Sequence, residues 1–126
     1  LEFDIRPLPG MNGDELRASI RERLLPIAAE HQVQIDYKPL FPGVPAFETP
    51  ADAPIVRACE ELTGQSAGAV AFATEGPYLN QLGMQTLILG PGDIDQAHQP
   101  DEFLALDRLQ PTIDLLQGLI RRFCLQ

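Results

Sequence analysis

The fold class is decided by residues 54–90, which read PIVRACEELTGQSAGAVAFATEGPYLNQLGMQTLILG. The stretch opens with a helix pattern over residues 54–63 and has a second, shorter one over residues 76–82. Two short apolar runs, residues 67–73 and 86–89, have the length of buried strands. Helices that alternate with short, wholly apolar strands predict an α/β fold with a covered sheet.

The sequence on the C-terminal side completes this pattern. Gly64 and Gly83 follow the two predicted helices directly, and glycine is favoured just past a helix end. Residues 90–92, which are Gly-Pro-Gly, stop the second strand. After a polar loop, apolar residues recur at helical spacing over residues 109–123. Pro111 is compatible with this last helix because it lies near the start.

The first forty residues predict a smaller layer of one helix on a sheet. A strand is predicted over residues 3–8, and Asn12 or Asp14 can cap the helix that follows. Pro26 is expected to kink that helix or to end its regular part. Apolar and polar side chains then alternate over residues 33–37, which predicts a half-buried strand. Five prolines between positions 39 and 54 predict a stiff connector and a domain boundary.

The composition excludes several classes of function. The chain has 126 residues, enough for one ordinary domain, and 44% of them are hydrophobic, which can fill a core. Asp and Glu outnumber Lys and Arg by 18 to 9, and Lys38 is the only lysine. The net charge of −9 excludes a basic nucleic-acid footprint and a polybasic membrane patch. No apolar run is long enough to cross a bilayer.

The cysteines indicate a cellular compartment, and the N-terminal sequence indicates how the chain begins. Cys59 and Cys124 form no disulfide framework at this spacing, and we interpret them as reduced thiols of a cytoplasmic protein. The chain opens at Leu1 without methionine, inside a predicted strand, and shows no signal-peptide pattern. We therefore expect a fragment that starts within a fold.

Polar residues follow both predicted buried strands, and α/β proteins place their sites at such strand ends. The second of these loops contains His98, for which two interpretations stay open. Neutral imidazole is the commonest metal ligand, and Asp95, Asp101 or Glu102 could orient it. The alternative is an exposed loop histidine among solvating acids. His31, at a predicted helix end, is interpreted as structural.

A complete metal site needs three or four ligands, but the sequence contains neither H-x-x-x-H nor C-x-x-C. Any further ligands of a metal at His98 therefore lie outside these residues. No serine or cysteine lies in a nucleophile elbow or beside a histidine, so no nucleophilic mechanism is predicted.

Two charged residues are candidates for binding the ends of a ligand. The guanidinium of Arg6, at a strand end, fits a carboxylate in a bidentate fork, and the alternative is a pair with a neighbouring acid such as Asp4. Glu75, in the loop after the first buried strand, could bind a cationic group. Its alternative role is that of a cap at a helix N-terminus.

Four motifs carry a resemblance to a known family. They are DIRPLPGM at residues 4–11, TEGPY at 74–78, LGPG at 89–92 and QAHQPDEF at 96–103. In this order and spacing, and over essentially its whole length, the chain resembles the dinuclear-zinc aminoacylase and carboxypeptidase family of metallopeptidases. The specific part is the segment from Gly90 to Glu102, because D-x-R followed by Pro-Gly is shared more widely.

The resemblance implies an α/β catalytic domain that is interrupted by a smaller lid, or dimerisation, domain of helices on a four-stranded sheet. Residues 1–43 then correspond to the second half of the lid, and residues 44–126 to the closing part of the catalytic domain. The resemblance further implies a homodimer formed through the lid and an N-acyl amino acid as substrate. Neither a nucleic acid nor a membrane is an implied partner.

The metal site implied by the resemblance is only partly contained in this chain. His98 matches the family's C-terminal metal-ligand histidine, and Asp101 and Glu102 are expected to support it. Two zinc ions, or cobalt in their place, are implied for the complete enzyme. The sequence contains no H-x-D motif, and the resemblance implies that this motif, the bridging aspartate and the family's Glu-Glu pair with the general base lie upstream of these residues. We therefore assign no catalytic residue here and expect no tight metal binding by this chain alone.

The resemblance also implies how substrate is bound. Arg6 matches the lid arginine that holds the substrate carboxylate, and the N–H groups of the turn containing Gly90 and Gly92 would lie near the same anion. Glu75 is expected to contact a side-chain amine. These roles predict zinc-dependent removal of an acetyl group from a diamino acid, with this chain inactive alone. The alternatives are a deacylase for another N-acyl or N-succinyl diamino acid, and a non-catalytic binding or dimerisation module.

Overall fold

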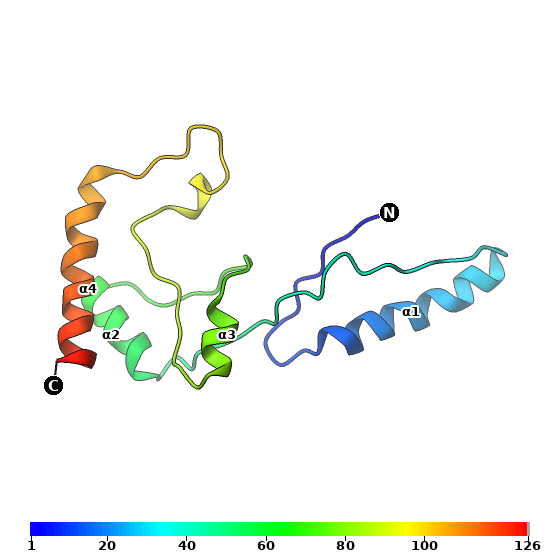
Figure 1. Ribbon diagram of the computed structural model, residues 1–126, viewed down its shortest axis with the longest axis horizontal. Helices are drawn as coiled ribbons and strands as arrows, with labels where there is room; N and C mark the ends of the chain where they lie inside the picture. The colour runs from blue at the N-terminus through cyan, green and yellow to red at the C-terminus, as the bar shows by residue number, and fades with distance from the viewer. Residues whose placement is uncertain (126) are drawn as a thin grey trace. The chain divides into compact units, whose positions relative to one another are not determined.

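The computed structural model describes residues 1–125, whose regular structure is helical (Figure 1). The α-helices are α1 (Gly13–Glu30), α2 (Pro54–Thr63), α3 (Gly76–Gln81) and α4 (Leu109–Cys124). Two single-turn 3₁₀ helices are η1 (Ile94–Gln96) and η2 (Leu106–Arg108). No helix in the described range is long and apolar enough to span a bilayer.

The chain divides into two compact units. Unit 1 comprises residues 1–48 and 71–83, and unit 2 comprises residues 49–70 and the chain from residue 84 onward. Helices α1 and α3 thus belong to unit 1, and α2 and α4 belong to unit 2. The division into a lid portion and a catalytic portion, which follows from the family resemblance, stays a prediction.

All four predicted helices are confirmed, and local signals set their ends. The side chain of Asn12 caps α1 by accepting hydrogen bonds from two N–H groups of the first turn, at 2.8 and 3.3 Å. Gly64 ends α2 in the left-handed region, with φ of 67°. Pro26 lies inside α1, which continues to Glu30, so the expectation that Pro26 could end the helix is wrong.

The four predicted strands are wrong, because the described part of the chain contains no β-strand. They were expected at residues 3–8, 33–37, 67–73 and 86–89. A strand is held by N–H and C=O groups that pair with a neighbouring strand, and here side chains take some of these groups instead. Arg6 donates to the carbonyl of Ala71 at 3.2 Å, and the hydroxyl of Thr49 donates to the carbonyl of Thr86. The apolar run that was expected to be covered, residues 67–73, is exposed.

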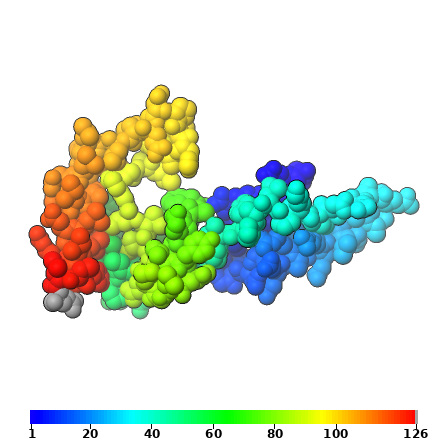
Figure 2. Space-filling model, viewed as in Figure 1, coloured from blue at the N-terminus to red at the C-terminus, as the bar shows by residue number. Residues whose placement is uncertain are grey.

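Unit 2 is organised around the packing of α2 on α4 (Figures 1 and 2). Its buried apolar residues are Ala53, Val56, Ala58 and Cys59. Gly118 of α4 lies against Leu62, since an added Cβ would come within 3.3 Å of the leucine methyl groups. An ion pair between Arg122 and Glu61, at 2.6 Å, also joins the helices. The apolar stripe of α4 remains about half exposed along Leu109, Ile113, Leu116, Ile120 and Phe123.

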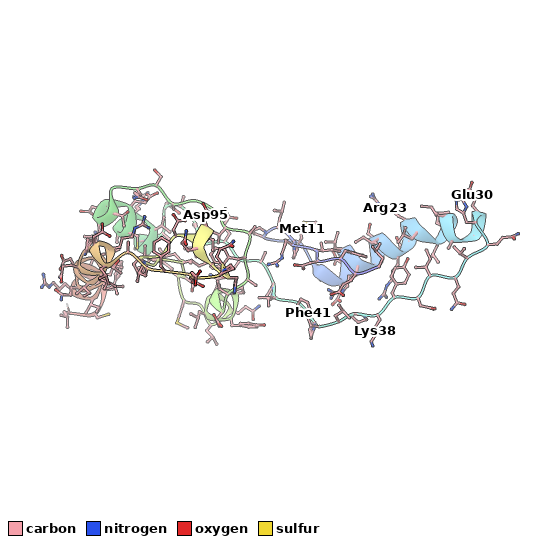
Figure 3. The ribbon with its side chains drawn as sticks, turned by 90° about the horizontal axis from the view of Figure 1, so that it is seen from above. Met11, Arg23, Glu30, Lys38, Phe41 and Asp95 are labelled. Atoms are coloured by element: carbon pink, nitrogen blue, oxygen red, sulfur yellow. The ribbon has the colours of Figure 1, made fainter. Side chains whose placement is uncertain are left out.

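In unit 1, the segment that follows α1 returns alongside the helix (Figures 1 and 3). The guanidinium of Arg21 lies over the ring of Tyr37, 5.2 Å from its centroid. Figure 3 places Lys38 and Phe41 on this returning segment and Arg23 on the opposite side of α1. The segment predicted as the second strand therefore contacts α1 through a cation–π interaction, and it forms no β-ladder with another described segment.

Candidate functional site

His98 lies within a run of overlapping turns in unit 2. Successive N–H groups donate to the carbonyl three residues earlier, from Gln96 to Asp93 (3.0 Å), Ala97 to Ile94 (3.1 Å), Gln99 to Gln96 (3.2 Å) and Glu102 to Gln99 (3.2 Å). In the turn over residues 96–99, Ala97 has φ −61° and ψ 130°, and His98 has φ +60°. These angles define a type II turn, whose third position favours glycine or asparagine. Histidine therefore holds a sterically unfavourable position.

The turn over residues 99–102 has a similar character. Pro100 occupies its second position, where proline's fixed φ is favoured, and Asp101 occupies the third with φ +60°. Left-handed backbone costs a residue with a Cβ about 1–2 kcal/mol. The loop thus maintains two such residues within four positions.

Glu102 links the two turns. Its carboxylate Oε2 accepts a hydrogen bond from the backbone N–H of His98 at 3.3 Å. The N–H at the third position of a type II turn is not used by the turn's own hydrogen bond, so Glu102 supplies its acceptor. The imidazole of His98 is exposed and makes no hydrogen bond or ion pair with any described residue. Glu102 therefore contacts the main chain of His98 rather than its ring.

The residues described by the structure do not by themselves form a metal site. Among residues 1–125, no group of three or more His, Cys, Asp or Glu side chains is placed to hold a metal ion. A zinc site needs at least three protein ligands, so the donor set of this chain does not fit a complete zinc centre. His98 can offer one nitrogen to a site whose other ligands lie elsewhere.

An open hollow of about 500 Å³ lies beside the His98 loop, which Figure 2 draws in yellow and orange. It is lined by Pro91, Gly92, Asp93, Gln96, Glu102, Phe103 and Leu104. The structure thus brings together two predicted site residues, Gly92 and Glu102. Sequence reasoning did not single out Asp93, Gln96 or Phe103. The sequence signal that could have found Asp93 is an aspartate directly before a helical turn, a position favoured for capping. In the structure its side chain accepts a hydrogen bond from the N–H of Asp95 at 3.1 Å.

Arg6, in unit 1, is held by two acceptors. Its Nε and Nη2 lie 2.7 Å from the same carboxylate oxygen of Asp4, and Nη1 donates to the carbonyl of Ala71 at 3.2 Å. The pair with Asp4, foreseen as one alternative, is thereby confirmed. Both side chains are more than half exposed, at 56% and 55%, and an exposed pair contributes only about 0–1 kcal/mol. Another carboxylate can therefore replace Asp4 at little energetic cost.

Glu75, also in unit 1, directly precedes α3, and its exposed side chain makes no capping hydrogen bond. The hydroxyl of Thr74 instead accepts from the N–H of Gly76 at 3.1 Å. Gly76 is buried beneath the ring of Phe47. The Glu75 carboxylate therefore takes no part in the turn before α3, which is held by Thr74 and by the packing of Gly76 against Phe47.

We expect replacement of Gly76 by alanine to destabilise unit 1 by about 1–3 kcal/mol, as overpacking of a filled site does. The added Cβ would lie 2.7 Å from two ring atoms of Phe47 and 3.1 Å from the Thr74 hydroxyl. Urea unfolding measures the change. Gly68→Ala is the matched control, because nothing lies within 4 Å of its added Cβ. Equal destabilisation by both variants would contradict the steric explanation.

The predicted site residues are distributed over both units. Arg6 and Glu75 belong to unit 1, whereas Gly90, Gly92, His98, Asp101 and Glu102 belong to unit 2. Among these residues, the described structure contains one hydrogen bond, which joins Glu102 and His98 within unit 2. Cys59 adds no nucleophile, because burial raises the pKa of its thiol and keeps it protonated.

Comparison with known proteins adds an independent finding. The sequence profile of peptidase family M20/M25/M40 matches residues 6–122. An acetylornithine deacetylase of Edwardsiella ictaluri is 46% identical over 124 residues, and those of Vibrio vulnificus and Aliivibrio fischeri are 45% and 44% identical over the same length. Each match covers 98% of this chain but 32% of the relative. The chain therefore spans about a third of the length of these curated relatives.

Proposed function

The chain belongs to peptidase family M20/M25/M40, and from that premise we propose that it forms part of a zinc-dependent amide hydrolase acting on N2-acetyl-L-ornithine. The products are ornithine and acetate, and the reaction supplies ornithine for arginine biosynthesis. The observation that carries this proposal is the 46% identity, over 98% of the chain, to a relative named acetylornithine deacetylase. That relative is about three times as long, so the activity is proposed for a longer polypeptide.

In this proposal the two portions of the chain serve different parts of the enzyme. Residues 1–43 form the second half of a lid through which the protein dimerises. Residues 44–126 form the closing part of an α/β catalytic domain. A cytoplasmic location is proposed on the interpretation of Cys59 and Cys124 as reduced thiols, and both are free in the structure.

His98 would provide one ligand to a zinc centre completed by residues outside this sequence. The exposed imidazole, which is hydrogen-bonded to no described residue, supports this role. Bound zinc would polarise the amide carbonyl and lower the pKa of a bound water. No catalytic step is assigned to a residue of this chain, since the family resemblance implies a general base outside these residues. The chain alone is expected to hydrolyse nothing.

Arg6 would bind the α-carboxylate of the substrate. In its present pair with Asp4, the Nε and Nη2 edge of Arg6 lies 2.7 Å from a carboxylate oxygen, which accepts its N–H groups. Gly90 and Gly92, in unit 2, would donate backbone N–H groups to a bound anion. A Cβ added at either glycine would meet nothing within 4 Å, so their backbones are open to a ligand.

The function is tested by comparing two substrates in the complete enzyme. We expect N-acetylornithine to be deacetylated in preference to a neutral N-acetyl amino acid, and Glu75→Gln to remove most of that preference, because the carboxylate would bind the substrate's side-chain ammonium. A charge-assisted hydrogen bond of this kind is worth about 1.5–3 kcal/mol, roughly 10-fold or more in kcat/KM. Gln65→Glu, at an exposed position in the chain, is a control that changes charge without touching the proposed contact.

The alternatives give different results in the same assay. Preferred cleavage of an N-succinyl diamino acid would replace the proposed substrate within the same reaction class. Absence of any hydrolysis, with retained binding of the amino acid, would indicate a non-catalytic binding or dimerisation module. Equal losses for both substrates with Glu75→Gln would refute the proposed contact between Glu75 and the side-chain ammonium.

A further inference from the structure

We propose that Glu102 is a positioning residue, which holds the backbone of His98 in the left-handed region so that the imidazole is presented from a fixed turn. The role of His98 as a metal ligand rests on the proposed function. The hydrogen bond between the His98 N–H and Glu102 is present in the structure whatever that function is. The expected role of Glu102 as a partner of the imidazole ring stays a prediction, and the contact described here is with the main chain of His98.

The backbone of the loop is unusual at two positions. His98 and Asp101 both have φ of +60°, and both stand at the third position of successive turns that glycine would fill with less strain. Residues with a Cβ persist in such conformations only where their surroundings over-determine them, and they concentrate at functional sites. A histidine in this position points to a need for its side chain.

A contact with Glu102 holds this backbone. The N–H of His98 is left free by its own turn, and the Oε2 atom of Glu102 accepts it at 3.3 Å. Glu102 also closes the second turn through its N–H, which donates to Gln99 at 3.2 Å. Glu102 therefore connects the last position of the turn over residues 99–102 to the third position of the turn over residues 96–99.

No other acidic residue of the loop, within the described chain, contacts the main chain of His98 in this way. The carboxylate of Asp93 accepts from the N–H of Asp95, at the start of η1. Asp95, which is labelled in Figure 3, and Asp101 make no side-chain hydrogen bond within residues 1–125. The three have the same charge as Glu102 and lie in the same loop, so charge alone does not account for the contact with His98.

The test is made by NMR on the isotopically labelled 126-residue chain, without metal. In Glu102→Ala we expect exchange of the His98 amide to become about fivefold faster, which corresponds to one ordinary hydrogen bond. The Cα and Cβ shifts of His98 should move away from left-handed values. Glu102→Gln keeps an acceptor oxygen and should retain most of the wild-type signal, while Asp95→Ala, the matched loss of a loop carboxylate, should leave the His98 signals unchanged. Unchanged His98 exchange and shifts in Glu102→Ala would overturn the proposal.

A second measurement relates this turn to the metal. In the complete enzyme, Glu102→Ala should weaken zinc affinity about 10–100-fold, the usual effect of a residue that supports a ligand, and Glu102→Gln should restore most of it. If His98→Ala leaves the zinc content unchanged, the ligand assignment fails while the NMR result still decides the role of Glu102. Zinc affinity that is unaffected by Glu102→Ala, with His98 confirmed as a ligand, would contradict the positioning role.

Discussion

Replacement of His98 by alanine in the complete enzyme should remove about one equivalent of zinc per subunit and nearly all deacetylation of N-acetylornithine. A catalytic zinc ion has three protein ligands, so the loss of one leaves a site with too few donors to retain the ion. Loss of a residue that merely supports a ligand already lowers metal affinity about 10–100-fold, and loss of the ligand itself should exceed that range. Metal analysis after gel filtration measures the effect directly.

The chain offers a matched control for this experiment. His31 is the other histidine, and it stands at the C-terminal cap of α1. His31→Ala removes an imidazole just as His98→Ala does, but it should leave the zinc content equal to that of the wild type. An unchanged zinc content in His98→Ala would identify His98 as an ordinary exposed loop histidine.

Replacement of Arg6 by alanine should weaken binding of N-acetylornithine by about 2 kcal/mol, roughly 30-fold, at the low end for a charged pair that loses one partner. The low end applies because the Arg6 side chain is 56% exposed in this structure. The loss should appear mainly as a higher KM. Arg6→Lys should recover only part of it, because an ammonium keeps the charge but lacks the planar fork.

The substrate itself provides the control for Arg6. An analogue that lacks the α-carboxylate should be cleaved equally well by the wild type and by Arg6→Ala. Asp4→Asn removes the local partner of Arg6 without removing the guanidinium, and it should not raise KM. If wild type cleaves the two substrates equally well, the carboxylate role of Arg6 is refuted.

The helices could be predicted from the sequence because their signals are local. Asn12 before α1 and Gly64 after α2 act through backbone groups within a few residues, and both perform these roles in the structure. Apolar runs such as residues 67–73 predict a strand only if another segment pairs with them. The sequence of one segment does not state where its partner lies, and no ladder forms in the described chain.

The candidate site was predictable to a similar extent. The pair between Arg6 and Asp4 follows from their separation of two positions, and it was foreseen as an alternative. The left-handed backbone of His98 was not foreseen, because no glycine or asparagine marks the position. Pro100 before Asp101 was the available signal for the second turn, since proline favours the second position of a type II turn. Glu102 was expected near His98 from its spacing, but not at the main chain.

The separation between bonded residues also predicts an order in which the parts of this chain form. Every hydrogen bond of the His98 loop described above joins residues two to four positions apart, whereas Arg6 reaches Ala71 across 65 positions. The entropy lost on closing a loop increases with its length, and a loop of about ten residues closes in roughly 10–100 ns. The histidine turn can thus form early in folding from its own local sequence. We expect the Arg6 contact to form later, when distant segments of unit 1 have come together.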